Sequence, residues 1–355
     1  MAGCKTACYT SVMRYRFIIL GGIVAGGLIA YYFLWAHLVD QVAGRATAWI
    51  ESQRAQGREV DYDRMRLWGF PYRLSVTFEN LRWHDPQSAA DWDLQADSVT
   101  AHLQLWKLEH VIFDLGGSQR LGWRPAAGAA RQQAILTSAR FLASMATDAA
   151  GAWQRFDTDI RQPKLAVGLQ DWAAERLRLH GRRGGNVPPS TDLALQVDNG
   201  VLPPEADGPL GRNVAALTLV GNLRGALYGK TPEEMLRTWR ESGGILDLST
   251  IGLQWDGLKL EGNGSLAVDR QMRPLGAMSG QIYGATHGID ALQALGRMTD
   301  KEAGAAKAAL VLLEQPDGEG KPHLTVPLSA QDGKLFLGPV PLFSLSSVLP
   351  APAQP

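Results

Sequence analysis

Apolar and polar residues alternate through most of the chain beyond its first 60 residues. The clearest runs of this kind lie at 74–78, 99–105, 193–197, 258–268 and 324–328. Because successive side chains of a β-strand point to opposite faces, a period of two predicts strands with one apolar and one polar face. Such strands are typical of antiparallel sheets, whereas the strands of a helix-covered parallel sheet carry unbroken apolar runs.

Two short segments that contain glycine are predicted to be turns. They are Glu261–Gly264 and Asp332–Gly333, and a strand at Leu335–Leu337 is expected to follow the second. The first begins the spacing G-x-G-x-x-A, which in dinucleotide-binding proteins opens a helix whose N-terminus meets the pyrophosphate. Here the alternation continues instead, at Leu266 and Val268. We therefore predict a hairpin turn at 261–264 and no cofactor.

An uncharged apolar segment, Phe17–Ala36, precedes the alternating region. As a helix this segment would span about 30 Å, the thickness of a hydrocarbon core. Basic residues and no acidic ones come before it, which predicts a single pass through the inner membrane, with residues 1–16 cytoplasmic and the bulk periplasmic. Its far end carries aromatic rings, which settle at the level of lipid headgroups: Tyr31, Tyr32 and Trp35.

Alternatives to this interpretation of the N-terminus stay open. A cleaved signal peptide would end in small residues, but this segment ends in bulky aromatic ones, which favours an uncleaved anchor. Translation could begin at Met1 or at Met13, because Met13 opens a compact basic segment of its own. Gly22 and Gly26 form a small-xxx-small pair that would allow a homodimer through the anchor helix.

Helical patterns interrupt the alternation elsewhere. A stalk helix is expected at 37–57, and a capped helix is expected to begin at Thr231–Pro232, bury Trp239 and end at Gly243–Gly244. The other segments predicted to be helical are 289–295, 301–314 and the alanine-rich stretch 125–160. The fold class is therefore α+β, mostly antiparallel β, with one transmembrane helix followed by a large twisted antiparallel sheet and a few packed helices.

A glycine- and proline-rich stretch, Gly181–Pro189, is the strongest internal boundary. It predicts a first β-rich half at 58–185 and a second, with helices, at 186–345. Residues 346–355 are rich in proline and are predicted to form an irregular tail.

Composition narrows the function classes. The 35 basic and 35 acidic residues cancel, whereas a protein that binds nucleic acid carries a basic excess, so no nucleic-acid partner is expected. The two cysteines, Cys4 and Cys8, both precede the apolar segment, so the folded domain has no disulfide and no thiolate metal site.

Residue patterns that carry chemistry are missing from the sequence. The seven histidines form no H-E-x-x-H motif, and no nucleophile elbow or P-loop is present. We predict no catalytic, cofactor-binding or metal-binding residue and no enzymatic activity. Trp68–Arg73 stands out for its aromatic residues around Pro71, and we interpret it as a bulged strand entry with a hydrophobic plug rather than a ligand contact.

Several of these features resemble a known family. An N-terminal anchor, the stretch Gly69–Arg73 before an alternating strand, the segment Gly262–Leu266 with Asp269, and Asp332–Gly333 with Leu337–Pro339 resemble the DUF2125 family of alphaproteobacterial envelope proteins of unknown function. The strand–G-x-G–strand–Asp pattern is also distantly similar to AsmA-like proteins. This second resemblance implies an apolar groove and lipid handling between membranes.

Two functions are consistent with this sequence. The first is a membrane-anchored periplasmic protein that binds or transfers a lipid or another apolar ligand on a one-faced sheet. The second is a non-catalytic envelope scaffold that recruits partners through strand edges or the anchor. A hydrolase is a third hypothesis and would need a polar cleft with two carboxylates or a His–Asp pair. The observation that would best distinguish these hypotheses is whether helices cover the apolar face of the sheet.

Overall fold

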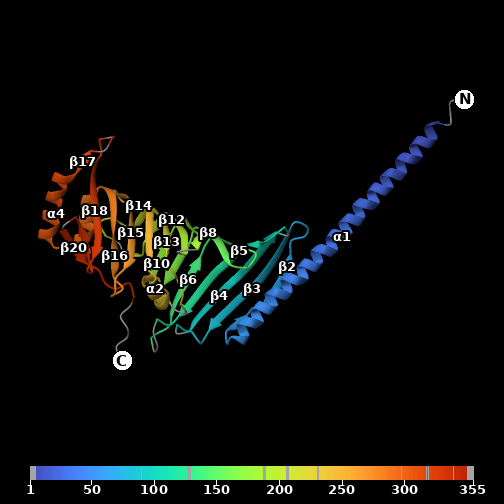
Figure 1. The fold of residues 1–355 in the computed structure, drawn as a ribbon, viewed down its shortest axis with the longest axis horizontal. Helices are drawn as coiled ribbons and strands as arrows, with labels where there is room; N and C mark the ends of the chain where they lie inside the picture. Colours follow the sequence, from blue (N-terminus) through green and yellow to red (C-terminus); the bar gives the residue numbers. More distant parts are fainter. Residues whose placement is uncertain are drawn as a thin grey trace.

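The computed structural model describes residues 5–88, 90–104, 106–125, 129–186, 189–204, 208–229, 232–296, 298–316, 318, 320–338 and 340–349. In this part of the chain one long helix leads into a large antiparallel sheet (Figure 1). The expected fold class, mostly antiparallel β with an N-terminal apolar helix, is confirmed.

The N-terminal helix α1 (Lys5–Ala55) contains both the predicted anchor and the predicted stalk. It runs without a break for 51 residues and ends just before Gly57, which has a φ of +79°. Its residues from Ile19 onward are long and apolar enough to cross a membrane, and the apolar window is not buried within the molecule. At about 1.5 Å per residue the whole helix is roughly 75 Å long.

Twelve strands form one continuous hydrogen-bonded ladder, in which each strand pairs with the next. From one end to the other they are β3 (Arg73–Asp85), β4 (Trp92–Gln104), β5 (Lys107–Trp123), β7 (Arg140–Thr147), β8 (Trp153–Arg161), β11 (Arg176–Asn186), β12 (Pro189–Val201), β13 (Asn213–Arg224), β14 (Ile245–Trp255), β15 (Leu258–Val268), β16 (Pro274–Tyr283) and β18 (Pro322–Gln331).

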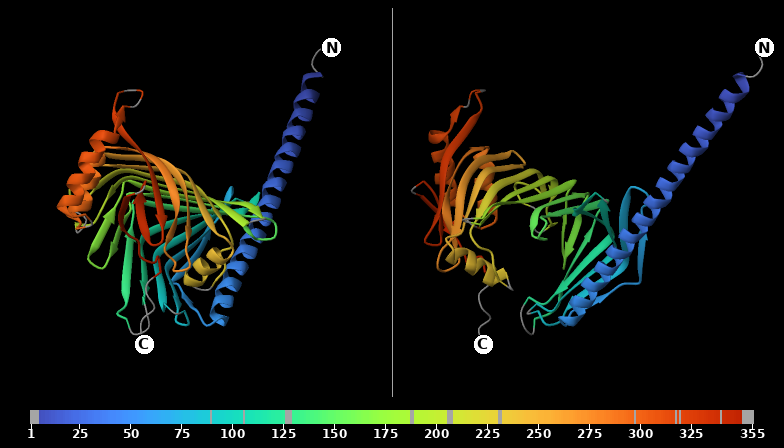
Figure 2. Two further views of the ribbon diagram at one scale, coloured as in Figure 1. Left: turned by 60° about the vertical axis from the view of Figure 1, so that its left-hand side comes forward. Right: turned by 45° about the vertical axis from the view of Figure 1, so that its right-hand side comes forward.

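Shorter strands extend the ladder at its ends and sides. They are β1 (Glu59–Asp61), β2 (Arg64–Trp68), β6 (Gln132–Thr137), β9 (Lys164–Val167), β10 (Gln170–Ala173), β17 (Gln315–Pro316), β19 (Lys334–Leu337) and β20 (Val340–Ser344). The sheet twists and arches between α1 and the C-terminal helices (Figure 2). The predicted boundary at Gly181–Pro189 coincides with the β11–β12 hairpin, and pairing continues across it. The division into halves stays an interpretation.

Helices pack at both ends of the sheet. At the C-terminal end α3 (Ala285–Ala294) and α4 (Asp300–Leu313) form a small core in which Ala285, Leu310 and Leu324 are buried. Thr299 caps α4, because its hydroxyl accepts a hydrogen bond from the Glu302 amide while the Glu302 carboxylate accepts one from Thr299.

At the N-terminal end, α1 is fastened to the first strands. The Arg54 guanidinium donates hydrogen bonds of 3.0 and 2.7 Å to the carbonyl of Val60, and Trp49 packs edge-on against Trp83 at 5.4 Å between ring centroids. Ile50 and Val60 are both buried at this junction.

The third helix region, α2 (Pro232–Glu241), joins β13 to β14. Trp239 is buried as predicted, and its indole donates a 2.7 Å hydrogen bond to the carbonyl of Arg224. The helix ends before Gly243 as expected, while the cap expected at Thr231 lies outside the described residues.

The predicted helix at 125–160 is wrong. Its described residues form β6, β7 and β8 instead. Alanine favours helices, but Phe141, Ala143 and Met145 also alternate at a period of two and pair with residues 160, 158 and 156 of β8. Pairing with two neighbouring strands outweighs intrinsic helix propensity, which is a weak preference of under about 1 kcal/mol per residue.

The predicted hairpin turn at 261–264 is also wrong, because β15 runs unbroken through these residues. Gly264 pairs with Met278 of β16, and a Cβ at Gly264 would lie 2.6 Å from the Met278 side chain. The carbonyl oxygen of Ala277 would lie still closer, at 2.5 Å, so the glycine permits a close approach of β16 and not a reversal of the chain. The turn at Asp332–Gly333 is confirmed, with both residues at positive φ between β18 and β19.

The segment Trp68–Arg73 forms the turn of the β2–β3 hairpin and not a bulged strand entry. Gly69 has a φ of +115°, and its carbonyl accepts a 3.1 Å hydrogen bond from the Arg73 amide. Because Gly69 and Pro71 together reverse the chain here, Phe70 and Tyr72 stand at the hairpin tip. Trp68, the last residue of β2, lies over the sheet, where its indole donates a 3.1 Å hydrogen bond to the Thr77 hydroxyl.

Truncation of a core residue of β3 should destabilise the protein measurably. Leu74 is completely buried, so Leu74→Ala should lower the free energy of unfolding by about 2–5 kcal/mol. Leu169→Ala is the matched control, because Leu169 is 92 % exposed and its truncation should cost within about 0.5 kcal/mol. Urea unfolding of the full chain in detergent measures both, and equal midpoints would contradict this packing.

Candidate functional site

The register of the ladder aligns apolar residues on one face of the sheet. A row that crosses all twelve strands consists of Leu74, Leu103, Val111, Met145, Phe156, Gly181, Leu193, Gly221, Leu248, Gly264, Met278 and Leu328, each paired with the next. The neighbouring row consists of Val76, Ala101, Phe113, Ala143, Thr158, Leu179, Leu195, Leu219, Ile251, Gly262 and Gly280. We call these two rows the apolar track.

The apolar track contains no charged residue and a single polar one, Thr158. Its large side chains are mostly aliphatic, and glycines lie between them. At Gly181 the Phe156 ring occupies the space a side chain would take, only 2.1 Å from an added Cβ. Twelve strands make eleven spacings of about 4.8 Å, so the track extends roughly 50 Å.

The central part of the track is only half-buried. The apolar-face side chains of β11, β12 and β13 all lie between buried and exposed; they are Leu177, Leu179, Leu193, Leu195, Val197, Leu217 and Leu219. By contrast Leu74, beside α1, and Leu324, beneath α3 and α4, are fully or almost fully buried. Helices thus complete the core at the two ends of the sheet, and the middle retains exposed apolar surface.

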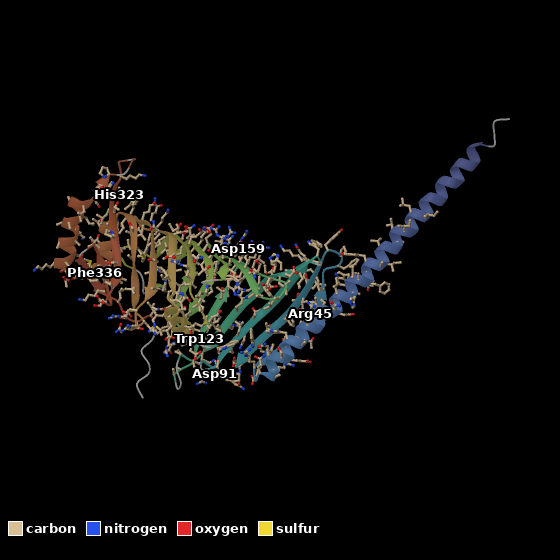
Figure 3. The ribbon with its side chains drawn as sticks, in the orientation of Figure 1. Arg45, Asp91, Trp123, Asp159, His323 and Phe336 are labelled. Atoms are coloured by element: carbon tan, nitrogen blue, oxygen red, sulfur yellow. The ribbon has the colours of Figure 1, made fainter. Side chains whose placement is uncertain are left out.

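The opposite face of the same strands carries charged pairs. Arg176 of β11 donates hydrogen bonds of 2.7 and 2.9 Å to Asp159 of β8, and His180 lies 2.8 Å from Asp157. Asp159 lies in the middle of the sheet, among side chains that stand on both of its faces (Figure 3). Such pairs between adjacent strands stabilise register on a solvated face.

These pairs shift the acidity of the carboxyl groups. Hydrogen bonds from Arg176 lower the pKa of Asp159, and hydrogen bonds from Arg182 and then Asn222 lower the pKa of Asp192. Burial by itself raises the pKa of Asp157, but hydrogen bonds from His180 and Arg155 outweigh it and lower the value. All three groups are therefore ionised at neutral pH.

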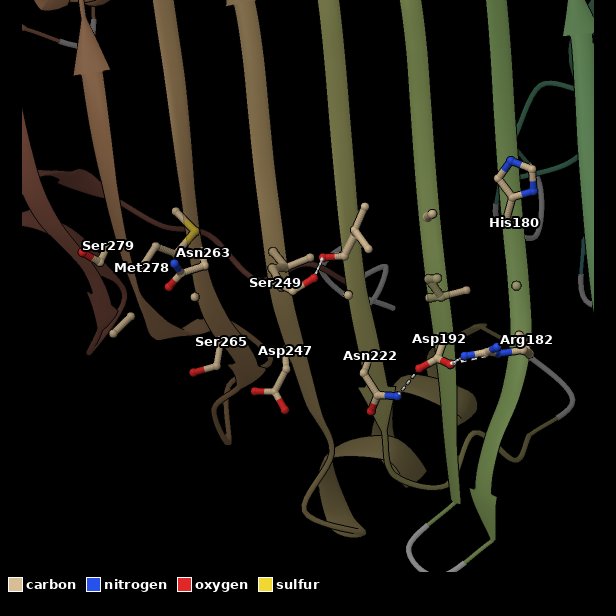
Figure 4. Close-up of a pocket in the computed structure, with 18 of the residues that line it drawn as sticks. His180, Arg182, Asp192, Asn222, Asp247, Ser249, Asn263, Ser265, Met278 and Ser279 are labelled. Carbon is tan, nitrogen blue, oxygen red and sulfur yellow. Dashed lines mark hydrogen bonds and ion pairs between the residues drawn. The ribbon is translucent and has the colours of Figure 1, made fainter. Parts of the chain in front are cut away.

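A shallow hollow of about 1180 Å³ lies on this polar face, across β8 and β11 to β18 (Figure 4). Small and polar side chains line it, among them Ser249, Ser265 and Ser279, and residues of the apolar track also border it, among them Leu193, Leu248 and Met278. Arg182 donates to Asp192 at 2.8 Å, and Asn222 donates to the other oxygen of Asp192 at 2.8 Å. The hollow thus presents hydrogen-bonding groups, many of which already bond to one another.

The hollow contains the His–Asp pair that a hydrolase would need, His180 with Asp157. The hydroxyl of Ser144, however, donates to Asp157 at 3.3 Å, and the described residues place no hydroxyl or thiol in hydrogen-bond contact with His180. A general base requires such a contact with the group that it activates. Among the described residues no cluster of three His, Cys, Asp or Glu side chains could hold a metal ion.

Sequence patterns predicted part of this surface. The alternation at 193–197 and 258–268 identified the apolar face, but the charged pairs were missed because their partners lie about 20 residues apart in the chain. The sequence did contain a signal, because alternate residues of a strand share a face. Once β8 is recognised as a strand, Asp157 and Asp159 lie on the same face as Arg176 and His180. His102 contacts the Ser75 hydroxyl at 2.8 Å.

Comparison with known proteins identifies a family model that covers residues 35–345 and is described as an uncharacterised protein conserved in bacteria, DUF2125. No curated protein and no solved structure matches the chain significantly. The match begins within α1 and ends one residue after β20, so it covers the whole described sheet.

Neutralising a paired carboxylate should change stability in a way that depends on pH. Since the pKa of Asp159 is lower in the folded chain, its contribution is present above its ordinary value near 3.8 and is lost as the pH falls through the folded value. Asp159→Asn should therefore destabilise by up to about 1 kcal/mol at neutral pH. Once the pH has fallen below the lowered pKa of Asp159 in the folded chain, the difference from the unmodified chain should vanish.

Denaturant midpoints of the full chain between a pH of about 2 and 7 measure this difference. Asp171→Asn is the control, because Asp171 is exposed and the described residues offer it no ion pair. If the loss of stability caused by Asp159→Asn did not change with pH, the ion pair with Arg176 would not be its cause.

Proposed function

The chain belongs to the DUF2125 family of bacterial proteins, and we propose that it is a single-pass inner-membrane protein whose periplasmic sheet binds acyl chains of lipids along the apolar track. The observation that carries this proposal is the central track at β11 to β13, where two aligned rows of apolar side chains remain half-buried. Exposed apolar surface costs about 25 cal/mol per Å², so a bound apolar partner would stabilise this region.

The composition of the track favours acyl chains over other apolar partners. Its central residues are leucines, whose side chains have no hydrogen-bonding group, and glycines, which leave shallow depressions between them. Within its two rows, β11 to β13 carry none of the aromatic or arginine anchors that dominate protein–protein interfaces, and Arg183 of β11 lies on the same face beyond the track. Its length of roughly 50 Å exceeds the roughly 30 Å of a bilayer's hydrocarbon core, so several acyl chains could lie along it.

The position of the track relative to the anchor supports a membrane source for the ligand. The first residue of the track, Leu74, lies in β3, and β3 pairs with β1, to which α1 is fastened. Because α1 covers this first residue, a lipid leaving the bilayer beside α1 would meet the track beyond it, toward the half-buried strands β11 to β13. The orientation follows from Arg14 and Arg16 before the span, which favour a cytoplasmic N-terminus.

A photocrosslinking experiment tests acyl-chain binding with neighbouring residues as matched controls. A benzophenone amino acid at Leu195 or Leu219 would point along the track, whereas the same group at Gln196 or Thr218 would point to the opposite face of the same strands. After irradiation in native membranes, mass spectrometry of the purified chain should show lipid adducts at 195 and 219 and none at 196 and 218.

The outcomes separate the two hypotheses from the sequence. Equal lipid adducts on both faces, or none on either, would reject binding along the track. Protein adducts at 195 and 219 in place of lipid would favour the envelope scaffold. Leu195→Glu, which introduces a charge into the track, should abolish lipid that co-purifies with the chain, whereas Gln196→Glu should retain it.

A further inference from the structure

We propose that the tips of the β2–β3 and β4–β5 hairpins form a second membrane contact, which seats the edge of the sheet in the lipid headgroup layer. The residues of this contact are Trp68, Phe70, Tyr72 and Trp106, which we call the aromatic rim. The proposal depends on α1 being a membrane span and does not depend on acyl-chain binding along the track.

The hairpin tip is fixed to one particular level of α1. Phe70 packs against Tyr31, Tyr32 and Trp35, with ring centroids 6.0, 5.9 and 5.4 Å apart. The Tyr31 hydroxyl donates a hydrogen bond to the carbonyl of Pro71, and the Trp35 indole donates one of 3.3 Å to that of Arg73. These three aromatic residues of α1 lie near the C-terminal end of its uncharged segment, Phe17–Ala36.

This level coincides with the membrane surface. A helix that crosses the bilayer with Phe17–Ala36 brings Tyr31 and Trp35 to the headgroups, where tyrosine and tryptophan are enriched. Because the Tyr31 and Trp35 side chains bond to the backbone of the β2–β3 turn, the turn lies at the same depth (Figure 1). The second hairpin lies beside it, since Arg73 pairs with Gln104 at the end of β4.

The rim is unusually exposed for its composition. Tyr72 is 76 % exposed and Trp106 is 71 % exposed, and Trp68 and Phe70 are each more than two-fifths exposed. Phe33 of α1, which neighbours the contacting residues Tyr32 and Trp35 in sequence, is also exposed. Large aromatic side chains left in water are costly, whereas at the headgroup layer their rings find an apolar environment and their polar atoms stay hydrated.

Basic residues flank the rim, as expected for contact with phosphate headgroups. The Arg73 guanidinium lies 4.6 Å from the centre of the Trp68 ring, and Lys107 follows Trp106 at the start of β5. Long basic side chains beside aromatic ones are typical of the membrane interface, where they reach the phosphates. We therefore assign the lipid bilayer, rather than a protein, as the partner of this surface.

Site-directed spin labelling of the full chain in vesicles tests this contact. Cys4→Ser and Cys8→Ser remove the natural thiols, and one nitroxide is then placed by Tyr72→Cys or Trp106→Cys, so that the rest of the rim stays intact. Vesicles of phosphatidylethanolamine with a minor fraction of phosphatidylglycerol supply the membrane. Collisions with oxygen, which concentrates in lipid, are compared with collisions with a water-soluble nickel chelate.

Two reference positions calibrate the measurement. Ile23→Cys reports the inside of the span, and Val311→Cys reports exposed α4 at the far end of the sheet (Figure 1). The ratio of oxygen to nickel collisions at 72 and 106 should be several-fold higher than at 311 and lower than at 23. Ratios at 72 and 106 equal to that at 311 would overturn the proposal.

The spin-label measurements test the rim contact independently of the proposed function. A lipid-like ratio at 23 with a water-like ratio at 72 and 106 would reject the rim contact while leaving the anchor intact. Failure of lipid crosslinking at 195 and 219 with lipid-like ratios at 72 and 106 would leave the rim contact standing. Tyr72→Ser should lower the ratio of a label placed by Trp106→Cys toward that at 311, with Phe70 and its contacts to α1 left unchanged.

Discussion

The register of the hydrogen-bonded ladder is the constraint on which the rest of the structure depends. In a strand with a period of two, a slip of one residue would move its whole apolar set to the other face. Register is therefore set by the apolar row that begins at Leu74 and, on the other face, by pairs such as Arg176 with Asp159. Both sets of contacts favour the same alignment, which is how a sheet of this length keeps two chemically distinct faces.

Among the described helices, α1 closes the core at one end of the sheet and α3 with α4 closes it at the other. Ile50 of α1 and Leu310 of α4 are buried, and the strands beneath them have apolar side chains with little exposure. Between these ends the sheet is stabilised by its backbone hydrogen bonds and by contacts among side chains within each face. The exposed middle of the sheet follows from this arrangement, because neither terminal helix region lies above β11 to β13.

Local sequence patterns predicted the fold wherever a pattern had a single interpretation. The alternation at 74–78 and 193–197, the long apolar helix and the helix at 301–314 were all recovered. The predictions at 125–160 and 261–264 were wrong because alanine and glycine have side chains too small to indicate which face of an element is buried. Their structure is decided by partners on other strands, such as Met278 above Gly264. The same holds for the candidate surface. Its apolar face was predicted from the sequence, whereas the charged pairs on the other face could be found only from the register of the strands.

The continuity of α1 has a mechanical consequence. The helix is regular from Lys5 to Ala55, so its apolar part and the part fastened to β1 form one continuous element. Membrane helices tilt when bilayer thickness changes. If α1 spans the bilayer as proposed, a continuous helix of about 75 Å would transmit that tilt to the sheet, which would move with the anchor rather than rotate independently of it.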